Sequence, residues 1–416
     1  MTHVLSMAAR EVGNPMPLRV LRKTDHRARY RGHERSMTPP ALGVEPSVAN
    51  GEDGTQTTGH DASRVRRWCR EGEGNSWHAP VFGRFVKGRI AFYGSVLLAL
   101  ILLVAYATAM PGTSYRGAPG EASPDEKALA LGLRAHVDAM SERIGERHLG
   151  RADSLASARD YILTTVRAVP GLKADQIHVE DVGPAGKHAE NIVVELRGAG
   201  AEVVVVGAHY DSAEGAAGAD DNASGVAAAL ELLRRASTHR FERTCRFVLF
   251  ANEEPPYFQT AGMGSLAHAR ASRQRGEHVS AMLSLESLGY YSDAEGSQRY
   301  PWPVGLLYPD RGDFVAFVGN LGSRSLVRDT IGAFRSTATV PSEGAALPAG
   351  IPGVGWSDHW AFWENGAAAV MVTDTAPFRN PNYHRASDRA ATLDYLKLAR
   401  VTLGLGRVVE ELAGAI

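Results

Sequence analysis

The sequence predicts an α/β fold, a mostly parallel mixed sheet with helices on both faces, preceded by one N-terminal transmembrane helix. Three observations support this prediction. Short apolar runs alternate with amphipathic helical patterns along residues 125–416, which is typical of a parallel sheet covered on both faces. Several of these runs end in acidic residues or histidine, and ligands of open α/β sheets bind at the carboxyl ends of the strands. Finally, an uncharged stretch at residues 90–110 precedes this part of the chain.

Residues 1–88 are predicted to be a basic tail without a fold of its own. They are rich in Arg, Gly, Pro, Ser and Thr and have little apolar periodicity. Such a segment cannot bury enough apolar surface to offset the entropy of ordering it. It is either a disordered cytoplasmic tail or upstream sequence translated from a wrongly assigned start.

Residues 89–110 are predicted to be a transmembrane signal anchor. The uncharged stretch from residue 90 to 110 would span about 31 Å as a helix, and the hydrocarbon core of a bilayer is ~30 Å thick. Basic residues flank its N-terminal side, namely Arg84, Lys87 and Arg89. By the positive-inside rule the N-terminus is cytoplasmic and the remainder is periplasmic or extracellular. A cleaved signal peptide is the alternative, but the apolar run exceeds a typical signal core, which favours a retained anchor.

A linker rich in Gly, Pro and Ser, residues 111–124, is predicted to lead into one domain, residues 125–416. Amphipathic patterns predict helices at residues 126–144, 154–169, 222–235, 264–275, 313–334 and 393–412. Short apolar runs predict strands at residues 191–196, 203–206, 245–251, 281–285 and 367–373.

The composition is ordinary for a globular protein, with 44% hydrophobic and 22% charged residues. The formal net charge is −1. Because no basic excess is available to neutralise phosphates, we do not expect a nucleic-acid partner.

Acidic residues and histidines collect beside the predicted strand ends. They are His209 and Asp211, the pair Asp220 and Asp221, the pair Glu253 and Glu254, then Glu286 and His384. Each alone has an ordinary explanation as a helix cap, a solvated turn or a surface histidine. Together, nitrogen and oxygen ligands without cysteine suit catalytic zinc. A carboxylate shared by two ions ~3.5–4 Å apart would make a two-metal hydrolytic site.

Five motifs, GAHYDS, GADDNASG, NEE, LES and PNYH, occur in an order and spacing that resemble the M28 family of zinc peptidases. That family contains aminopeptidases and some carboxypeptidases. The resemblance covers residues 125–416, and the segments at residues 144–147 and 357–363 also resemble family members. It implies the zinc-exopeptidase fold, two Zn²⁺ ions per chain and peptide substrates.

The resemblance also implies the metal ligands. His209 and Glu286 would bind one zinc ion, Glu254 and His384 would bind the other, and Asp221 would bridge both. Many family members carry aspartate where this chain has Glu286, so we expect an altered geometry at that position. The peptide bond that follows Asp221 is expected to be cis.

Two further residues would serve catalysis. Asp211 would support His209, and Glu253 would be the general base that takes a proton from the attacking water and returns it to the leaving amine. These roles, too, are what the resemblance implies.

The predicted function is that of a membrane-anchored, exported zinc exopeptidase, with an aminopeptidase favoured. One alternative is a glutaminyl-peptide cyclotransferase, which shares the fold and a zinc site resembling Asp221, Glu254 and His384. The intact two-metal set of ligands, which includes His209, argues against it without excluding it. The other alternative is a non-catalytic ectodomain, against which every proposed ligand position holds a competent side chain.

Overall fold

The computed structural model describes residues 79–118, 120–184 and 186–416. Most of the predicted basic tail, residues 1–78, therefore lies outside the described residues. Residues 79–88 belong to helix α1 (Ala79–Thr108), which begins before the predicted anchor and ends close to its predicted end.

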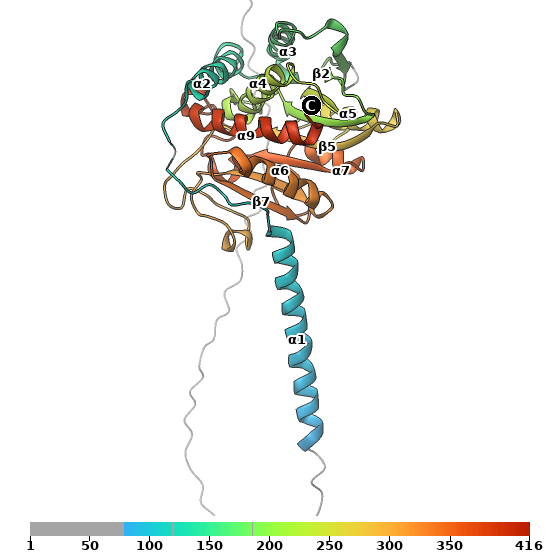
Figure 1. The fold of residues 1–416 in the computed structure, drawn as a ribbon, viewed down its shortest axis with the longest axis vertical. Coiled ribbons are helices and arrows are strands. Elements are labelled where there is room, and N and C mark those ends of the chain that lie inside the picture. Colours follow the sequence, from blue (N-terminus) through green and yellow to red (C-terminus); the bar gives the residue numbers. More distant parts are fainter. Residues whose placement is uncertain (1–78, 119, 185) are drawn as a thin grey trace, which may run out of the picture. The chain divides into compact units, whose positions relative to one another are not determined.

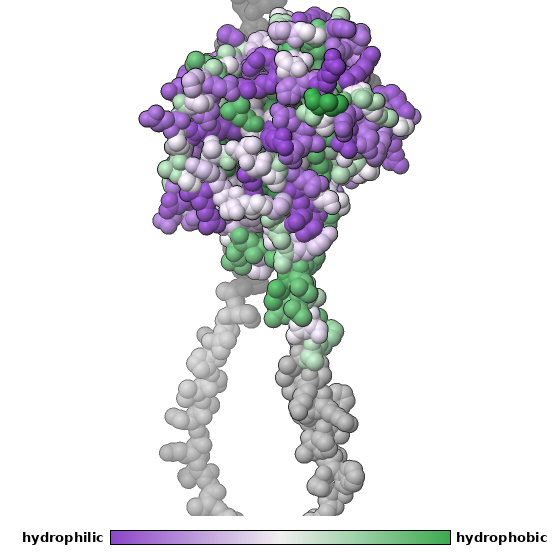
Figure 2. Space-filling view, viewed as in Figure 1, coloured by the Kyte–Doolittle hydropathy of each residue, from purple (hydrophilic) through white to green (hydrophobic). Residues whose placement is uncertain are grey.

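Helix α1 is long and apolar enough to cross a membrane. Its segment Ala91–Thr108 has a mean hydropathy of 2.1 and is 6% buried. Figure 2 shows apolar side chains gathered on this helix, whereas polar side chains predominate on the visible face of the residues that follow it. The apolar stretch is thus helical, as expected.

Eight strands form a single sheet in the order β1-β2-β4-β3-β5-β8-β6-β7 (Figure 1). Their bounds are β1 (Ile177–Asp181), β2 (Glu190–Leu196), β3 (Glu202–His209), β4 (Thr244–Phe250), β5 (His278–Glu286), β6 (Val315–Asn320), β7 (Ser342–Leu347) and β8 (Ala369–Thr373). The four neighbours β4, β3, β5 and β8 are parallel. Strand β6 is antiparallel to β8, and β7 is parallel to β6. The mixed sheet confirms the α/β part of the predicted fold class.

This topology gathers particular strand ends at one edge of the sheet. The carboxyl ends of β4, β3, β5 and β8 meet there, and the amino ends of β6 and β7 lie beside them because these two strands run the opposite way. Loops from several parts of the chain therefore converge at this edge.

Helices pack on both faces of the sheet. The larger core contains buried side chains of α2 (Pro124–Val137), α3 (Ala152–Arg167), α4 (Gly225–Ala236), α6 (Arg324–Thr337) and α9 (Tyr395–Ala413). The smaller core contains those of α5 (Gly264–Gln274) and α7 (His359–Glu364). Strand β3 serves both, because Val204 and Val206 face the larger core whereas Val203 and Val205 face the smaller.

A capping box fixes where the domain begins. The Ser123 side chain accepts a hydrogen bond from the Glu126 backbone N–H at 3.1 Å, and the Glu126 carboxylate accepts one from the Ser123 N–H at 2.7 Å. Because two otherwise unpaired donors are satisfied together, the helix starts directly after the linker. Helix α2 continues into a π-helical segment, Asp138–Ile144, which matches the predicted end of that helix.

One predicted element is wrong. The helix expected at residues 313–334 is strand β6 in its first part, and α6 begins only at Arg324. Most residues of β6 are buried, and a strand covered on both faces forms a continuous apolar run that periodicity cannot distinguish from a buried helix. Strands β1 and β7 were not predicted.

Candidate active site

The predicted site residues meet at the edge where the parallel strands end. His209 is the last residue of β3 and Glu286 is the last residue of β5. Glu253 and Glu254 follow β4, Asp221 lies in the turn before α4, and His384 lies in the loop after β8. Residues up to 175 positions apart thus share one site because the strand ends are adjacent.

Two clusters of side chains share Asp221. In the first, Nε2 of His209 lies 3.2 Å from Oδ1 of Asp221 and 3.3 Å from Oε2 of Glu286. In the second, Nε2 of His384 lies 3.1 Å from Oδ2 of Asp221 and 3.2 Å from Oε2 of Glu254. Each oxygen of the Asp221 carboxylate therefore faces a different cluster. Within each cluster the donor atoms all lie within 4.8 Å of one another, close enough to surround a single ion.

The burial of these donors fits a cation. His209 is 1% exposed, and neither of its ring nitrogens has a hydrogen-bond partner among the described residues. Glu254 also has a buried carboxylate oxygen, Oε1, without a partner among those residues. Buried polar atoms are normally hydrogen-bonded, so such atoms facing one another call for a bound group. A nitrogen and oxygen donor set without cysteine is suited to zinc.

The charges of the site also indicate a bound cation. Burial raises the pKa of Glu254 to about 7, and the neighbouring charge of Asp221 adds to the shift. Burial would lower the pKa of His384, but its hydrogen bonds to Asp221 and Glu254 outweigh this and raise it to about 10. The carboxylates of Asp221 and Glu254 are buried and repel each other at close range, so a divalent cation between them would stabilise their charged forms.

The profile of peptidase family M28 matches residues 191–409. The protein YfbL of Escherichia coli, described as uncharacterized, is 36% identical over 325 residues, which are 76% of this chain and 95% of YfbL.

This chain belongs to peptidase family M28.

Other relatives and neighbours agree with this assignment. A probable leucine aminopeptidase of Trichophyton verrucosum is 29% identical over 51% of this chain and 55% of its own length, so the chain spans about half of that relative. BSAP, a zinc aminopeptidase from Bacillus subtilis, is 15% identical with a TM-score of 0.53, covering 68% of this chain and 94% of BSAP. A glutaminyl cyclase from Tannerella forsythia has a TM-score of 0.50 at 18% identity, covering 67% of this chain and 97% of the cyclase. At such identities the two structures establish the fold alone.

Membership makes the chain a metallo-exopeptidase of the hydrolase class, with zinc as the implied metal. All seven predicted site residues lie in the cluster described above or in contact with it. The peptide bond between Asp221 and Asn222 is cis, as the resemblance implied. The role of each residue stays a prediction.

In this M28 peptidase, Asp211 links two parts of the site. Its carboxylate accepts hydrogen bonds from the backbone N–H groups of Glu253 and Glu254, both at 3.1 Å. Its Oδ1 also lies 3.5 Å from Nδ1 of His209. Asp211 can therefore position the histidine on one side and the glutamate pair on the other.

Glu253 lies beside His209 without belonging to either cluster of donors. Its Oε2 lies 3.9 Å from Nε2 of His209, and the side chain is buried. Burial raises its pKa well above the usual range; the charge of His209 opposes the shift and that of Glu286 adds to it. A carboxylate with a raised pKa is a stronger base, which is what proton transfer near neutral pH requires.

Three supporting residues were not assigned a role from the sequence. Ser357 donates a hydrogen bond to Oε2 of Glu286 at 2.8 Å. Asp388 accepts hydrogen bonds from the backbone N–H groups of Asp220 at 2.9 Å and Asp221 at 3.2 Å. Ser357 lies in one of the segments that resemble the family, which was the available signal.

The third, Arg147, is fully buried and binds backbone carbonyl oxygens on both sides of the site. Its guanidinium donates to Tyr210 at 2.6 Å, Ala217 at 2.5 Å and Gly218 at 2.8 Å. It thereby ties the end of β3 to the loop that carries Asp221. Its segment, residues 144–147, also resembled the family.

Proposed function

We propose that this chain is a zinc aminopeptidase that binds two Zn²⁺ ions. His209 and Glu286 would hold one ion, Glu254 and His384 the other, and Asp221 both. The observation that carries the proposal is the orientation of Asp221, whose two carboxylate oxygens face separate histidines at 3.2 and 3.1 Å. The leucine aminopeptidases among the relatives support cleavage at the amino end of a peptide.

When bound, zinc lowers the pKa of a water molecule and polarises the substrate carbonyl group. The protein's own part is proton transfer and orientation. Glu253 would accept the proton of the attacking water on its carboxylate and deliver it to the leaving amine. Asp211 would keep His209 and the Glu253–Glu254 turn in register, since a misplacement of about 1 Å can cost 10²-fold in rate.

The test uses the full chain in detergent and a panel of aminoacyl p-nitroanilides, with metal content measured by mass spectrometry. We expect cleavage that chelation abolishes and zinc restores. The variant Glu253→Gln should lower kcat by about 10²- to 10⁴-fold while keeping its zinc. The control Glu364→Gln changes an exposed glutamate and should leave kcat unchanged.

Other outcomes would redirect the assignment. Peptides with a blocked amino terminus should not be cleaved, and cleavage from their carboxyl end would indicate a carboxypeptidase instead. Conversion of a peptide with N-terminal glutamine to the pyroglutamyl form, without hydrolysis of any anilide, would indicate a cyclase.

We also propose that α1 anchors an exported catalytic domain, residues 125–416. The support is its apolar length and the basic residues before it, Arg84, Lys87 and Arg89. An anchored protein should remain in the membrane fraction after alkaline extraction, and protease added outside intact cells or spheroplasts should digest the domain. Release of the protein by alkali would contradict anchoring.

A further inference from the structure

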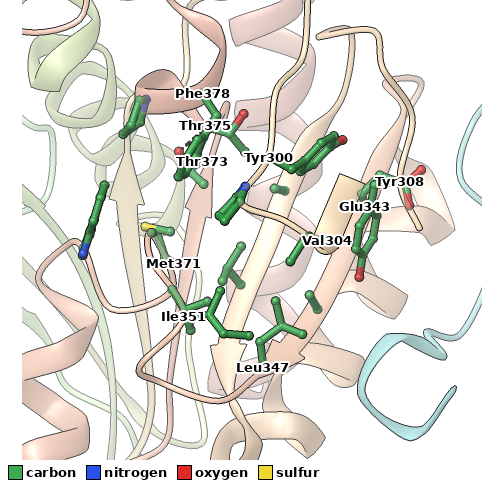
Figure 3. Close-up of a pocket in the computed structure, with 18 of the residues that line it drawn as sticks. Tyr300, Val304, Tyr308, Glu343, Leu347, Ile351, Met371, Thr373, Thr375 and Phe378 are labelled. Carbon is green, nitrogen blue, oxygen red and sulfur yellow. Dashed lines mark hydrogen bonds between the residues drawn. The ribbon is translucent and has the colours of Figure 1, made fainter. Parts of the chain in front are cut away.

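A pocket beside the candidate active site extends along the sheet towards the edge strand β7. It has an empty volume of about 830 Å³, counting its open mouth, and Glu286 and Tyr383 line its end near the proposed metal ligands. Its other walls are mostly apolar and come from β6, β7, β8 and the loops around residues 300 and 351. Figure 3 shows Glu343 and Tyr308 at one end of the pocket and Thr373 at the other.

The sheet register connects the two ends. Glu286 of β5 pairs with Thr373 of β8, Thr373 pairs with Ala316 of β6, and Ala316 pairs with Glu343 of β7. Residues in one row across a sheet point to the same face, and neighbouring strands lie ~4.8 Å apart, so the row spans roughly 14 Å between its two glutamates. Between the two glutamates this row contributes Thr373 and Ala316, whose small side chains line the pocket.

Among the residues that the structure describes, no hydrogen bond or ion pair involves the Glu343 carboxylate, which feels Arg335 and Arg116 only through their charges. The nearby hydroxyl groups are engaged elsewhere: Tyr308 donates to the carbonyl oxygen of Gly344 at 2.9 Å and Tyr300 to that of Pro309 at 2.6 Å. Arg335 binds Ser342 instead. Burial raises the pKa of Glu343, with the positive charges of Arg335 and Arg116 opposing the shift and Asp313 adding to it.

An acidic group at the far end of an apolar pocket suits a side chain with a long aliphatic stem and a positive end. The stem would pack along the apolar walls while the charged end pairs with the carboxylate. The ring faces of Tyr300 and Tyr308, which stack with centroids 6.0 Å apart, add a surface that attracts cations.

We infer that this pocket binds the first side chain of the peptide substrate and that Glu343 selects lysine or arginine there. The inference rests on the proposed aminopeptidase function. Lysine reaches about 6 Å and arginine about 7 Å from the Cα atom. With the scissile carbonyl group held beside the metal ligands, the substrate Cα atom would lie about 5 Å along the row from the Glu286 carboxylate, which leaves roughly 9 Å to Glu343. A side chain of about 6–7 Å and a hydrogen bond of ~3 Å cover that distance. Leucine, which reaches roughly 3 Å, cannot.

The experiment compares lysyl, arginyl, norleucyl and leucyl p-nitroanilides with the full chain in detergent. Norleucine has the aliphatic stem of lysine without its charge, so the ratio of the lysyl to the norleucyl kcat/KM isolates the charge. We expect this ratio to exceed about tenfold and to fall by about ten- to a hundredfold in Glu343→Gln, because a charged hydrogen bond is lost. Norleucyl cleavage should not fall.

A matched control and a second variant distinguish the loss of the Glu343 charge from a disturbance of the fold. Glu295→Gln removes an exposed carboxylate that does not line the pocket and should leave the ratio unchanged. Glu343→Lys should reverse the preference, so that norleucyl exceeds lysyl cleavage.

The possible failures are distinguishable. Cleavage of leucyl and norleucyl anilides, without a preference for lysine that depends on Glu343, would overturn the role of this pocket and leave the aminopeptidase proposal intact. Absence of cleavage of every anilide by zinc-loaded protein would overturn the proposed function, and the pocket assignment with it.

Discussion

Asp211 accepts a hydrogen bond from the backbone N–H of Glu254 at 3.1 Å. Asp211 is not itself a proposed metal ligand, but its carboxylate holds the turn that carries the proposed ligand Glu254. The same carboxylate lies 3.5 Å from Nδ1 of His209. Removal of its charge should therefore disturb both clusters of donors at once.

We predict that Asp211→Asn lowers zinc affinity by about 10- to 100-fold, the usual effect of losing a group that orients a ligand. Competition with a chelator of known affinity measures this. The control Asp293→Asn changes a side chain that is 82% exposed and should bind zinc as the parent does. Unchanged affinity in Asp211→Asn would contradict the orienting role.

Ser357 offers a test of whether two separate metal positions exist. It donates to Glu286 at 2.8 Å and, among the described residues, makes no hydrogen bond to Asp221, Glu254 or His384. Ser357→Ala should weaken zinc binding at the position of Glu286 while sparing the other position, because an unsatisfied buried carboxylate costs about 1–3 kcal/mol.

Titration calorimetry of Ser357→Ala should then show one tight and one weakened site. Two equally weakened sites would mean that Glu286 does not belong to a separate position. Thr330→Ala is a suitable control, because it removes a buried hydroxyl group that bonds only to carbonyl groups of its own helix.

Arg147 is predicted to be essential for the stability of the fold around the site. Its guanidinium binds the carbonyl oxygens of Tyr210, Ala217 and Gly218, and burial lowers its pKa to about 10, so it remains charged near neutral pH. Lysine cannot reproduce this planar array of donors.

Arg147→Lys should lower the free energy of unfolding by at least about 3 kcal/mol, because several buried carbonyl groups lose their partner. Urea unfolding of the metal-free protein measures this change. Arg151→Lys, at a side chain 59% exposed, should stay within about 0.5 kcal/mol of the parent.

The sequence predicted those strands whose apolar runs are short and end in polar residues. Strand β3 is the clearest case, because four consecutive valines precede Gly207 and His209. Strand β6 was not recognised because its apolar run continues almost directly into α6. Strand β7 was not recognised because Ser342–Leu347 consists mainly of small residues with low strand propensity. Because Glu343 belongs to β7, the sequence did not indicate that it lines a pocket beside the site.

The candidate site was predicted as a set of residues, but its supporting hydrogen bonds were not. The serine that holds Glu286 is 71 positions away in the chain, and the aspartate that holds the backbone of Asp221 is 167 positions away. Such pairings depend on which strand ends become neighbours. That is a property of the sheet order, and local patterns do not contain it.

The last prediction concerns acid stability and depends on His359. This side chain is fully buried, and its Nε2 lies 2.8 Å from the carbonyl oxygen of Val354. A carbonyl group can only accept a hydrogen bond, so Nε2 carries the proton of the neutral ring. Burial lowers the pKa of His359 to about 4, and the backbone hydrogen bond only partly opposes this shift.

In the unfolded chain a histidine has a pKa of about 6.5, so between pH 6.5 and 4 the unfolded state binds more protons than the folded state. The stabilisation by neutral His359 is therefore complete above pH 6.5 and is lost as the pH falls towards 4. At pH 5 the loss amounts to about 2 kcal/mol.

His359→Gln keeps a donor for Val354 and removes the titration. Between pH 7.5 and 5 its free energy of unfolding, measured in urea, should therefore fall by about 2 kcal/mol less than that of the parent. The exposed His239→Gln should follow the parent at both pH values, and parallel losses in His359→Gln and the parent would show that His359 does not govern acid stability.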